Sequence, residues 1–104
     1  MMSYLDLIII FDLNNKIQHF FENGLKLCKN MLKQNLKLHF IIYDTDNNKT
    51  EEVDIDTYIN DRLYTLIKEY LKEKNIILSN NELHNITQNY INIYYPNFLK
   101  ELYD

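Results

Sequence analysis

Glycine, proline, cysteine and arginine each occur once in this chain, and alanine does not occur at all. A single glycine, Gly24, cannot build the glycine-rich loops that hold dinucleotides or nucleotide phosphates, because those loops need at least two glycines. A single cysteine, Cys28, cannot form a disulfide within the chain or a cysteine metal set. These scarcities exclude the commonest nucleotide-binding motifs and favour a reducing, cytoplasmic location.

The sequence also lacks a hydrophobic run long enough to cross a membrane. Its densest apolar stretch, residues 5–13, is interrupted by Asp6 and Asp12, and no basic residue precedes it. A membrane-spanning helix needs about 20 apolar residues, and a secretory signal begins with positive charge. We therefore expect neither a membrane span nor a signal peptide.

What fills the chain instead is asparagine, isoleucine, lysine and tyrosine, the residues that A/T-rich codons encode. This bias indicates a virus, a phage or another A/T-rich genome rather than a particular chemistry. Hydrophobic residues make up 46% of the 104 residues and charged residues 25%, which is ordinary globular usage. At this length one core is expected, so residues 1–104 are predicted to form a single compact domain.

A β-hairpin over about residues 36–55 is the clearest structural signal. With a turn at Asn47–Asn48, the predicted register places Ile42 opposite Val53. One face is then apolar, while the other carries His39 and acidic side chains. A slip of one residue would turn the acidic side chains toward the core, so the alternation favours this pairing.

Helical spacing of apolar residues predicts two amphipathic helices, over residues 15–34 and 57–74. Asp56 is the expected N-cap of the second. A third helix is marked by a capping box at residues 79–82, and Pro96 is expected to interrupt or kink it. These three segments would supply the helical part of the fold.

The first segment is the ambiguous one. Residues 4–13 contain the β-branched run Ile8–Ile10, which favours a strand, whereas Ser3 and Asp6 would cap a helix that continues into residues 15–34. We favour the strand, because an isolated hairpin is marginal in water and needs a third strand or a helix to cover it. The predicted order is β-α-β-β-α-α, an α+β fold whose hairpin packs against three helices.

Oxygen-bearing side chains alternate along the hairpin at the spacing of the first ligands of a calcium-binding loop, at Asp44, Asp46, Asn48, Thr50 and Glu52. The pattern then fails, because Lys49 occupies the position that requires glycine and Ile55 the position of the bidentate glutamate. We therefore predict a solvated acidic hairpin tip without a metal ion.

His39 would lie across the hairpin from Asp56 in the predicted register, an arrangement that can orient an imidazole as a general base. No nucleophile is near either residue in the sequence, and Cys28 falls on the apolar stripe of its helix, where free cysteines behave as buried hydrophobes. We therefore predict no catalytic residue, no cofactor and no enzymatic activity. The chemical role of His39 itself stays open.

Two charged surfaces remain as candidate binding sites. One is an acidic patch that would attract a basic protein partner, formed by Asp44, Asp46, Glu51, Glu52, Asp54 and Asp56. The other is a lysine stripe that would meet the phosphates of a nucleic acid, formed by Lys16, Lys26, Lys29, Lys33 and Lys37. The formal net charge of −4 and the single arginine favour the acidic patch.

Tyr95 and Tyr103 are the C-terminal aromatic residues that helical spacing leaves outside the core, and we expect them at a dimer or partner interface. Together these features predict a small non-catalytic protein-interaction domain. It would be an accessory or inhibitor-type protein whose acidic surface binds a basic partner, which can itself be a nucleic-acid-binding protein. The alternative is a nucleic-acid-binding protein that uses the lysine stripe, with a homodimer concentrating two such faces.

Overall fold

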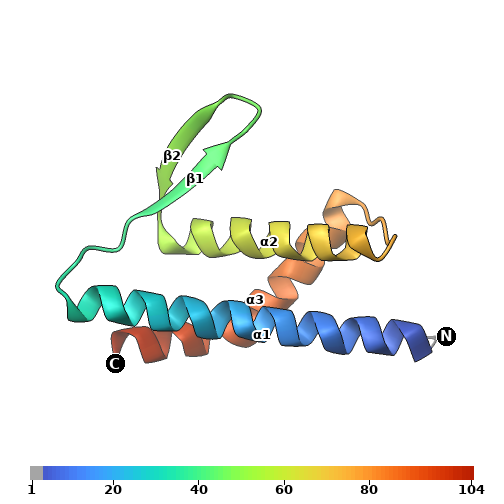
Figure 1. Ribbon diagram of the computed structural model, residues 1–104, viewed down its shortest axis with the longest axis horizontal. Helices are drawn as coiled ribbons and strands as arrows, with labels where there is room; N and C mark the ends of the chain where they lie inside the picture. The colour runs from blue at the N-terminus through green and yellow to red at the C-terminus, as the bar shows by residue number, and fades with distance from the viewer. Residues whose placement is uncertain (1–3) are drawn as a thin grey trace.

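The computed structural model describes residues 4–104. The elements follow in the order α1 (Tyr4–Lys33), β1 (Phe40–Asp44), β2 (Lys49–Val53), α2 (Ile55–Glu73) and α3 (Asn80–Tyr103). The three helices form the body of the protein, and the two antiparallel strands project from it (Figure 1). The chain is therefore a small single-domain α+β fold, which confirms the predicted class.

The segment predicted as a first strand is helical, so that prediction was wrong. Residues 4–13 are the N-terminal half of α1, a continuous helix of 30 residues. Each β-branched residue at Ile8–Ile10 costs less than about 0.7 kcal/mol of helix propensity. That cost is small beside the benefit of continuing the buried stripe that includes Leu13 and Ile17. The element order is α-β-β-α-α.

The core lies where the three helices meet. Its fully buried side chains come from each of them: Ile17 from α1, Leu63 and Ile67 from α2, and Thr87 from α3. The hydroxyl of Thr87 donates a hydrogen bond to the carbonyl oxygen of Leu83 at 2.7 Å, so this buried polar group is satisfied. The apolar stripes predicted for the helices thus face one another.

The capping box predicted at the start of α3 is present. The Ser79 hydroxyl accepts a hydrogen bond from the Glu82 backbone N–H at 3.2 Å, and the Glu82 carboxylate accepts one from the Ser79 N–H at 3.2 Å. α3 continues through Pro96 to Tyr103 and changes direction along its length (Figure 1). Pro96 supplies a cause for the bend, because proline has no N–H to donate and crowds the preceding turn.

The hairpin forms with a register two residues away from the predicted one. Phe40 pairs with Val53 and Ile42 with Glu51, because a four-residue turn over residues 45–48 replaces the predicted two-residue turn. An even shift keeps every side chain on its predicted face of the sheet. Its effect is to place Glu51, rather than Val53, beside Ile42.

Only the base of the hairpin is anchored to the described part of the helical body. The ring of Phe40 lies with its centre 5.0 Å from that of Tyr58 in α2, and Leu38 also packs against the core. Farther out, Ile41 and Tyr43 are 59% and 54% exposed. The support that a two-stranded hairpin needs therefore comes from α2 rather than from a third strand.

Tyr70 joins α2 to α1 through its hydroxyl group. The hydroxyl donates a hydrogen bond to the Asp12 carboxylate at 2.7 Å. The ammonium groups of Lys16 and Lys74 lie 5.7 and 5.6 Å from the centre of the ring. Burial, followed by the hydrogen bond to Asp12, raises the pKa of Tyr70 to about 12.

We expect the free energy of unfolding to fall between about pH 10 and pH 12, because an unfolded tyrosine ionises near pH 10 and folded Tyr70 near pH 12. Across that interval the unfolded chain has released a proton that the folded chain retains, so rising pH favours unfolding. Urea unfolding at stepped pH measures the decline. The Tyr70→Phe variant has no ionising group at this position and should show a shallower decline, and equal slopes would contradict the assignment.

Candidate functional site

The hairpin arm, which we define as residues 37–56, carries the net charge of the protein. It holds six acidic side chains against Lys37 and Lys49, which gives −4, and the rest of the chain holds nine acidic and nine basic side chains, which gives zero. The arm projects from α2 while the helices pack together beside it (Figure 1). Four of the six acidic side chains lie on the projecting strands and their turn, and Asp54 and Asp56 lie at the base of the arm, where the chain enters α2.

The tip of the arm is held by aspartate and asparagine side chains. The Asp44 carboxylate accepts hydrogen bonds from the backbone N–H of Asp46 at 3.0 Å and from the side-chain amide of Asn47 at 2.7 Å. Asn48 has a φ of 51° and accepts a hydrogen bond from the Tyr43 hydroxyl. The hydrogen bonds from Asn47 and Asp46, with that from the Asn47 side chain first, lower the pKa of Asp44. Asp44 is thus an ionised residue that shapes the turn.

His39 contacts Glu52 rather than Asp56, which corrects the predicted pairing. Its Nδ1 atom lies 2.8 Å from the Glu52 Oε1 atom, and both side chains are exposed. In the observed register Glu52 pairs with Ile41, so its contact with His39 is a diagonal one on the same face of the hairpin, and Asp56 lies beyond the strand in α2. An exposed pair of this kind adds little to stability.

Two members of the predicted acidic patch have structural contacts at the base of the arm. Asp54 is the N-cap of α2, and it accepts a hydrogen bond from the backbone N–H of Thr57 at 2.8 Å. The hydrogen bonds from Thr57 lower the pKa of Asp54. Asp56, predicted as the cap, lies in the first turn of α2 and accepts a hydrogen bond from the hydroxyl of Tyr95 in α3. Asp44 is half-buried, and the other five members of the patch, including Asp54 and Asp56, are exposed.

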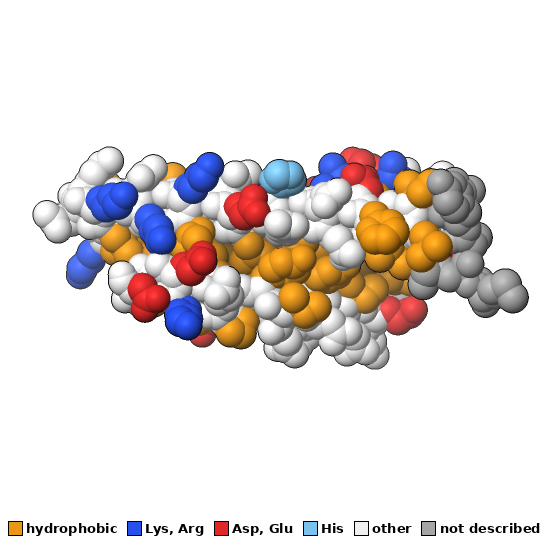
Figure 2. Space-filling model, turned by 90° about the horizontal axis from the view of Figure 1, so that it is seen from below, with side chains coloured by type: hydrophobic (Ala, Val, Ile, Leu, Met, Phe, Trp, Pro, Cys, Tyr) orange, Lys and Arg blue, Asp and Glu red, His pale blue; other side chains and the backbone are white. Residues whose placement is uncertain are grey.

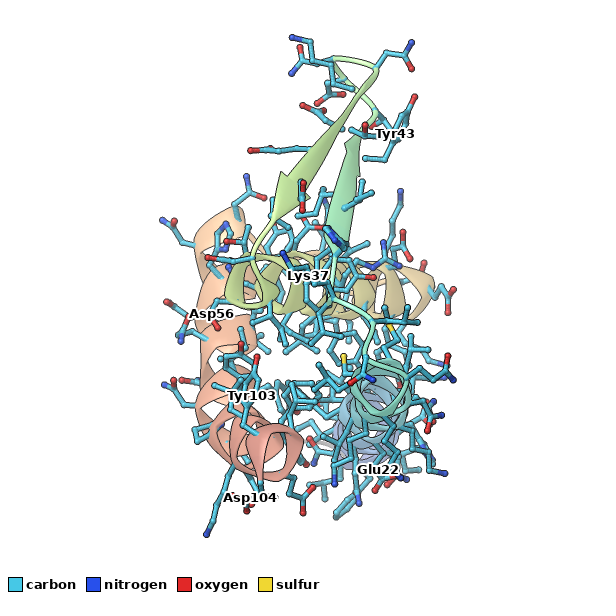
Figure 3. All side chains as sticks on the ribbon, turned by 90° about the vertical axis from the view of Figure 1, so that its left-hand side faces the viewer. Glu22, Lys37, Tyr43, Asp56, Tyr103 and Asp104 are labelled. Carbon is cyan, nitrogen blue, oxygen red and sulfur yellow. The ribbon has the colours of Figure 1, made fainter. Side chains whose placement is uncertain are left out.

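The two tyrosines predicted at an interface have different surroundings. Tyr95 is half-buried, with its ring stacked on Phe98 at 5.8 Å between centres. Burial, followed by the hydrogen bond to Asp56, raises the pKa of Tyr95. Tyr103 is exposed near the end of α3, and Figure 3 places it on the helical body, far from Tyr43 on the arm. Only Tyr103 of the pair presents most of its ring to solvent.

The lysine stripe is interspersed with carboxylates in space. Lys29 and Lys33 line a shallow hollow together with Glu101 and Asp104 of the C-terminal end. Figure 2 shows basic and acidic side chains intermixed over this end of the molecule. Neighbouring charges of opposite sign weaken the positive field that would attract phosphates.

The other three lysines of the stripe occupy separate settings. Lys16 lies over the ring of Tyr70, and Lys26 is exposed on α1. Lys37 lies beyond the end of α1, at the base of the arm (Figure 3). The structure thus does not gather the five predicted lysines into one uniformly basic surface.

Cys28 is buried, as its place on the apolar stripe of α1 predicts, and burial raises the pKa of its thiol. Among residues 4–104, no three His, Cys, Asp or Glu side chains are grouped so that they could hold a metal ion. The same residues contain no helix that is both long and apolar enough to cross a membrane.

An apolar groove that was not predicted from the sequence lies between the N-terminal half of α1 and α3. Its volume is about 580 Å³. Its apolar walls include Ile9, Ile10 and Leu13 of α1, Leu71 of α2, and Ile86 and Ile93 of α3. The available signal was the composition of residues 7–11, which are apolar on every side when they are placed on a helix.

We name the exposed surface beside this groove the apolar face of α1. It is formed by four residues of α1, which are 37–65% exposed, and by one residue of α3 across the groove, which is 66% exposed. The four are Leu7, Ile8, Ile10 and Phe11, and the residue of α3 is Ile93. Figure 2 shows hydrophobic side chains running along this side of the molecule toward the N-terminal end. Contiguous apolar surface of this extent marks an interaction site in many proteins.

The hairpin arm and the apolar face of α1 are therefore the two surfaces of the described residues that differ most from an ordinary solvated surface. Comparison with protein families, with curated proteins and with solved structures finds no match to this chain.

Proposed function

We propose that this protein is a non-catalytic interaction domain whose hairpin arm captures an extended, basic segment of a partner protein. The observation that carries this proposal is that residues 37–56, the projecting hairpin and its junction with α2, hold a net charge of −4 while the rest of the chain sums to zero. A concentrated charge steers a partner of opposite sign toward the arm and orients it there. An accessory or inhibitor-type role, in which the arm occupies the basic surface of its target, suits this arrangement.

The open edges of the arm supply backbone groups for such a segment. The described sheet has two strands, so each strand has one edge that pairs with no neighbouring strand. An added strand pairs with the N–H and carbonyl groups of an edge, and edge charges select which strand is accepted. Because β2 carries Glu51 and Glu52, it repels another acidic strand and attracts a basic one.

The exposed apolar side chains of β1 add contact area beside the charges. Ile41 pairs with Glu52 and Tyr43 pairs with Thr50, so these four side chains share one face of the sheet. On an added strand of alternating lysine and valine, the lysines would share this face with Glu52 and lay their aliphatic stems against Ile41 and Tyr43, and the valines would lie on the opposite face. This combination favours a segment of that pattern over a merely cationic one.

The lysine-stripe alternative is less well supported. Glu101 and Asp104 share a hollow with Lys29 and Lys33, and Lys16 is engaged with Tyr70. Nucleic-acid binding depends on a continuous basic surface facing the phosphates. We therefore do not propose it as a second function.

The proposal is tested with Asp46→Lys combined with Glu51→Lys, which brings the net charge of the arm from −4 to zero without touching the cap at Asp54 or the contact at Asp56. The probe is a peptide of alternating lysine and valine, with an alternating glutamate and valine peptide as reference. We expect the double variant to bind the basic peptide at least about tenfold more weakly, since each exposed charge pair is worth up to about 1 kcal/mol and reversal turns attraction into repulsion. Titration calorimetry measures both affinities.

The matched control is Glu22→Lys combined with Glu69→Lys, which makes the same change in net charge on exposed positions of α1 and α2. This control should bind the basic peptide with nearly the affinity of the unchanged protein. An equal loss in both double variants would show that only total charge matters. That result, or equal binding of the acidic and basic peptides by the unchanged protein, would reject the arm as the recognition element.

A further inference from the structure

A second copy of this chain is the partner that we propose for the apolar face of α1. Four of its residues, Leu7, Ile8, Ile10 and Phe11, lie within little more than one turn of the helix and are 37–65% exposed. At about 100° per residue they spread around roughly half of the helix circumference. Ile9 packs toward the core on the other side, so the stretch from Leu7 to Phe11 is apolar all round, with Asp6 and Asp12 at its two ends. A helix of that composition is normally covered on every side.

The shape of the surface suits contact with its own copy. Leu7 and Phe11, four residues apart, form a ridge on α1, and the groove lies beside that ridge, with Ile10 on one wall and Ile93 across from it. A two-fold dimer requires a surface that complements itself. Here the ridge of one copy can enter the groove of the other, and the reverse contact forms at the same time.

The exposed apolar area matches what a stable dimer buries. The five side chains of the apolar face together expose the equivalent of between two and three whole residues. Large aromatic side chains bury roughly 150–250 Å² each, and leucine and isoleucine are smaller, so this is at most about 400–600 Å² per copy. A standard interface buries about 800 Å² per partner, of which about 60% is apolar. The apolar face alone therefore supplies about the apolar share of such an interface.

The distribution of charge also favours a second copy. Two arms brought together would oppose two charges of −4, whereas the helical body has no net charge, so bodies meet without electrostatic repulsion. The residues that line the groove include one charged side chain, Asp6, so a strongly charged partner would find little complement there. The apolar face is also distant from the arm (Figure 1), and the dimer would leave both arms accessible. This inference does not depend on the function proposed for the arm.

The test is the mass of the full chain in solution, measured by sedimentation equilibrium over a dilution series. We expect a dimer, and we expect Phe11→Glu and Ile93→Lys each to raise its dissociation constant at least about 30-fold, the effect of losing a central apolar contact. Both side chains are largely exposed in the single chain, so neither change should disturb the fold. Circular dichroism checks that expectation.

Leu27→Glu is the matched control, because Leu27 is 63% exposed on the same helix but lies outside the apolar face. It should leave the dimer intact. A monomer at every concentration would overturn the proposal and assign the face to another occupant, such as the helix of a different protein or an apolar small molecule. A dimer weakened as much by Leu27→Glu as by Phe11→Glu, or an open series of larger assemblies, would overturn it as well.

Discussion

Replacing Phe98 with alanine is expected to lower the free energy of unfolding by about 3–5 kcal/mol. Phe98 is buried in α3 just after Pro96, and its ring centre lies 5.9 Å from that of Phe21 in α1. One of its ring atoms would lie 3.7 Å from a Cβ atom built on Gly24, so the ring rests against the backbone of α1. Truncation would leave a cavity between two helices whose backbones are held elsewhere along their lengths, and such a cavity closes only in part.

Urea unfolding followed by circular dichroism measures this loss. The comparison must be made at one protein concentration, because dimerisation would make the apparent stability depend on concentration. Phe98→Leu keeps most of the side-chain volume and should lose less, and Leu27→Ala, at an exposed position, should change stability by no more than about 0.5 kcal/mol. A loss below about 1 kcal/mol for Phe98→Ala would show that the ring is not a central packing element.

The parts of the fold that could be predicted from sequence depend on neighbouring residues. The capping box needs only Ser79 and Glu82 three positions later, and it is present as predicted. The helical stripes likewise depend on spacing within a few turns, and the predicted helices over 57–74 and after residue 79 correspond to α2 and α3. Local rules therefore suffice where the local preference and the tertiary contacts agree.

The predicted register of the hairpin and the predicted N-cap of α2 were both wrong, because side-chain hydrogen bonds shape the turn between the strands. Asp44 accepts bonds from the residues that follow it and shapes a four-residue turn, which shifts the strand pairing by two. Aspartate is a common residue in such turns, so the Asp44–Asn48 stretch did contain the signal. The shorter strand lets α2 start earlier, and the cap moves from Asp56 to Asp54. The acidic residues of the patch lie along the arm and at its base. Asp44 shapes the turn, Asp54 caps α2, and Asp56 contacts Tyr95.

The first helix and the groove beside it could not be predicted from local preference. The β-branched run at Ile8–Ile10 favours a strand by itself, and a two-stranded hairpin needs a third strand or a helix to cover it. The cover comes instead from Tyr58 of α2, and residues 4–13 extend α1. The groove then depends on where α3 leaves α1, which is a property of three helices together rather than of any one segment.

Replacing Leu63 with alanine is expected to lower the free energy of unfolding by about 2–5 kcal/mol while leaving capture of the basic peptide unchanged. Leu63 is fully buried in the core, and it lies on the same helix as Tyr58, which holds the base of the arm. Alanine keeps the helix intact, so Tyr58 and the cap at Asp54 should stay in place. The substitution should therefore lower the stability of the helical body without changing the peptide-binding surface of the arm.

The two measurements on Leu63→Ala separate stability from recognition. Urea unfolding reports the loss in the core, and calorimetric titration with the lysine and valine peptide reports the arm, under conditions where the variant is still folded. The Asp46→Lys, Glu51→Lys variant is expected to bind the peptide weakly. If Leu63→Ala bound the peptide equally weakly, the arm could not be an independent recognition element. An unchanged affinity beside a large loss of stability would instead separate the two roles, because charges at the tip of the arm act on a partner directly while Leu63 acts only by holding the helices together.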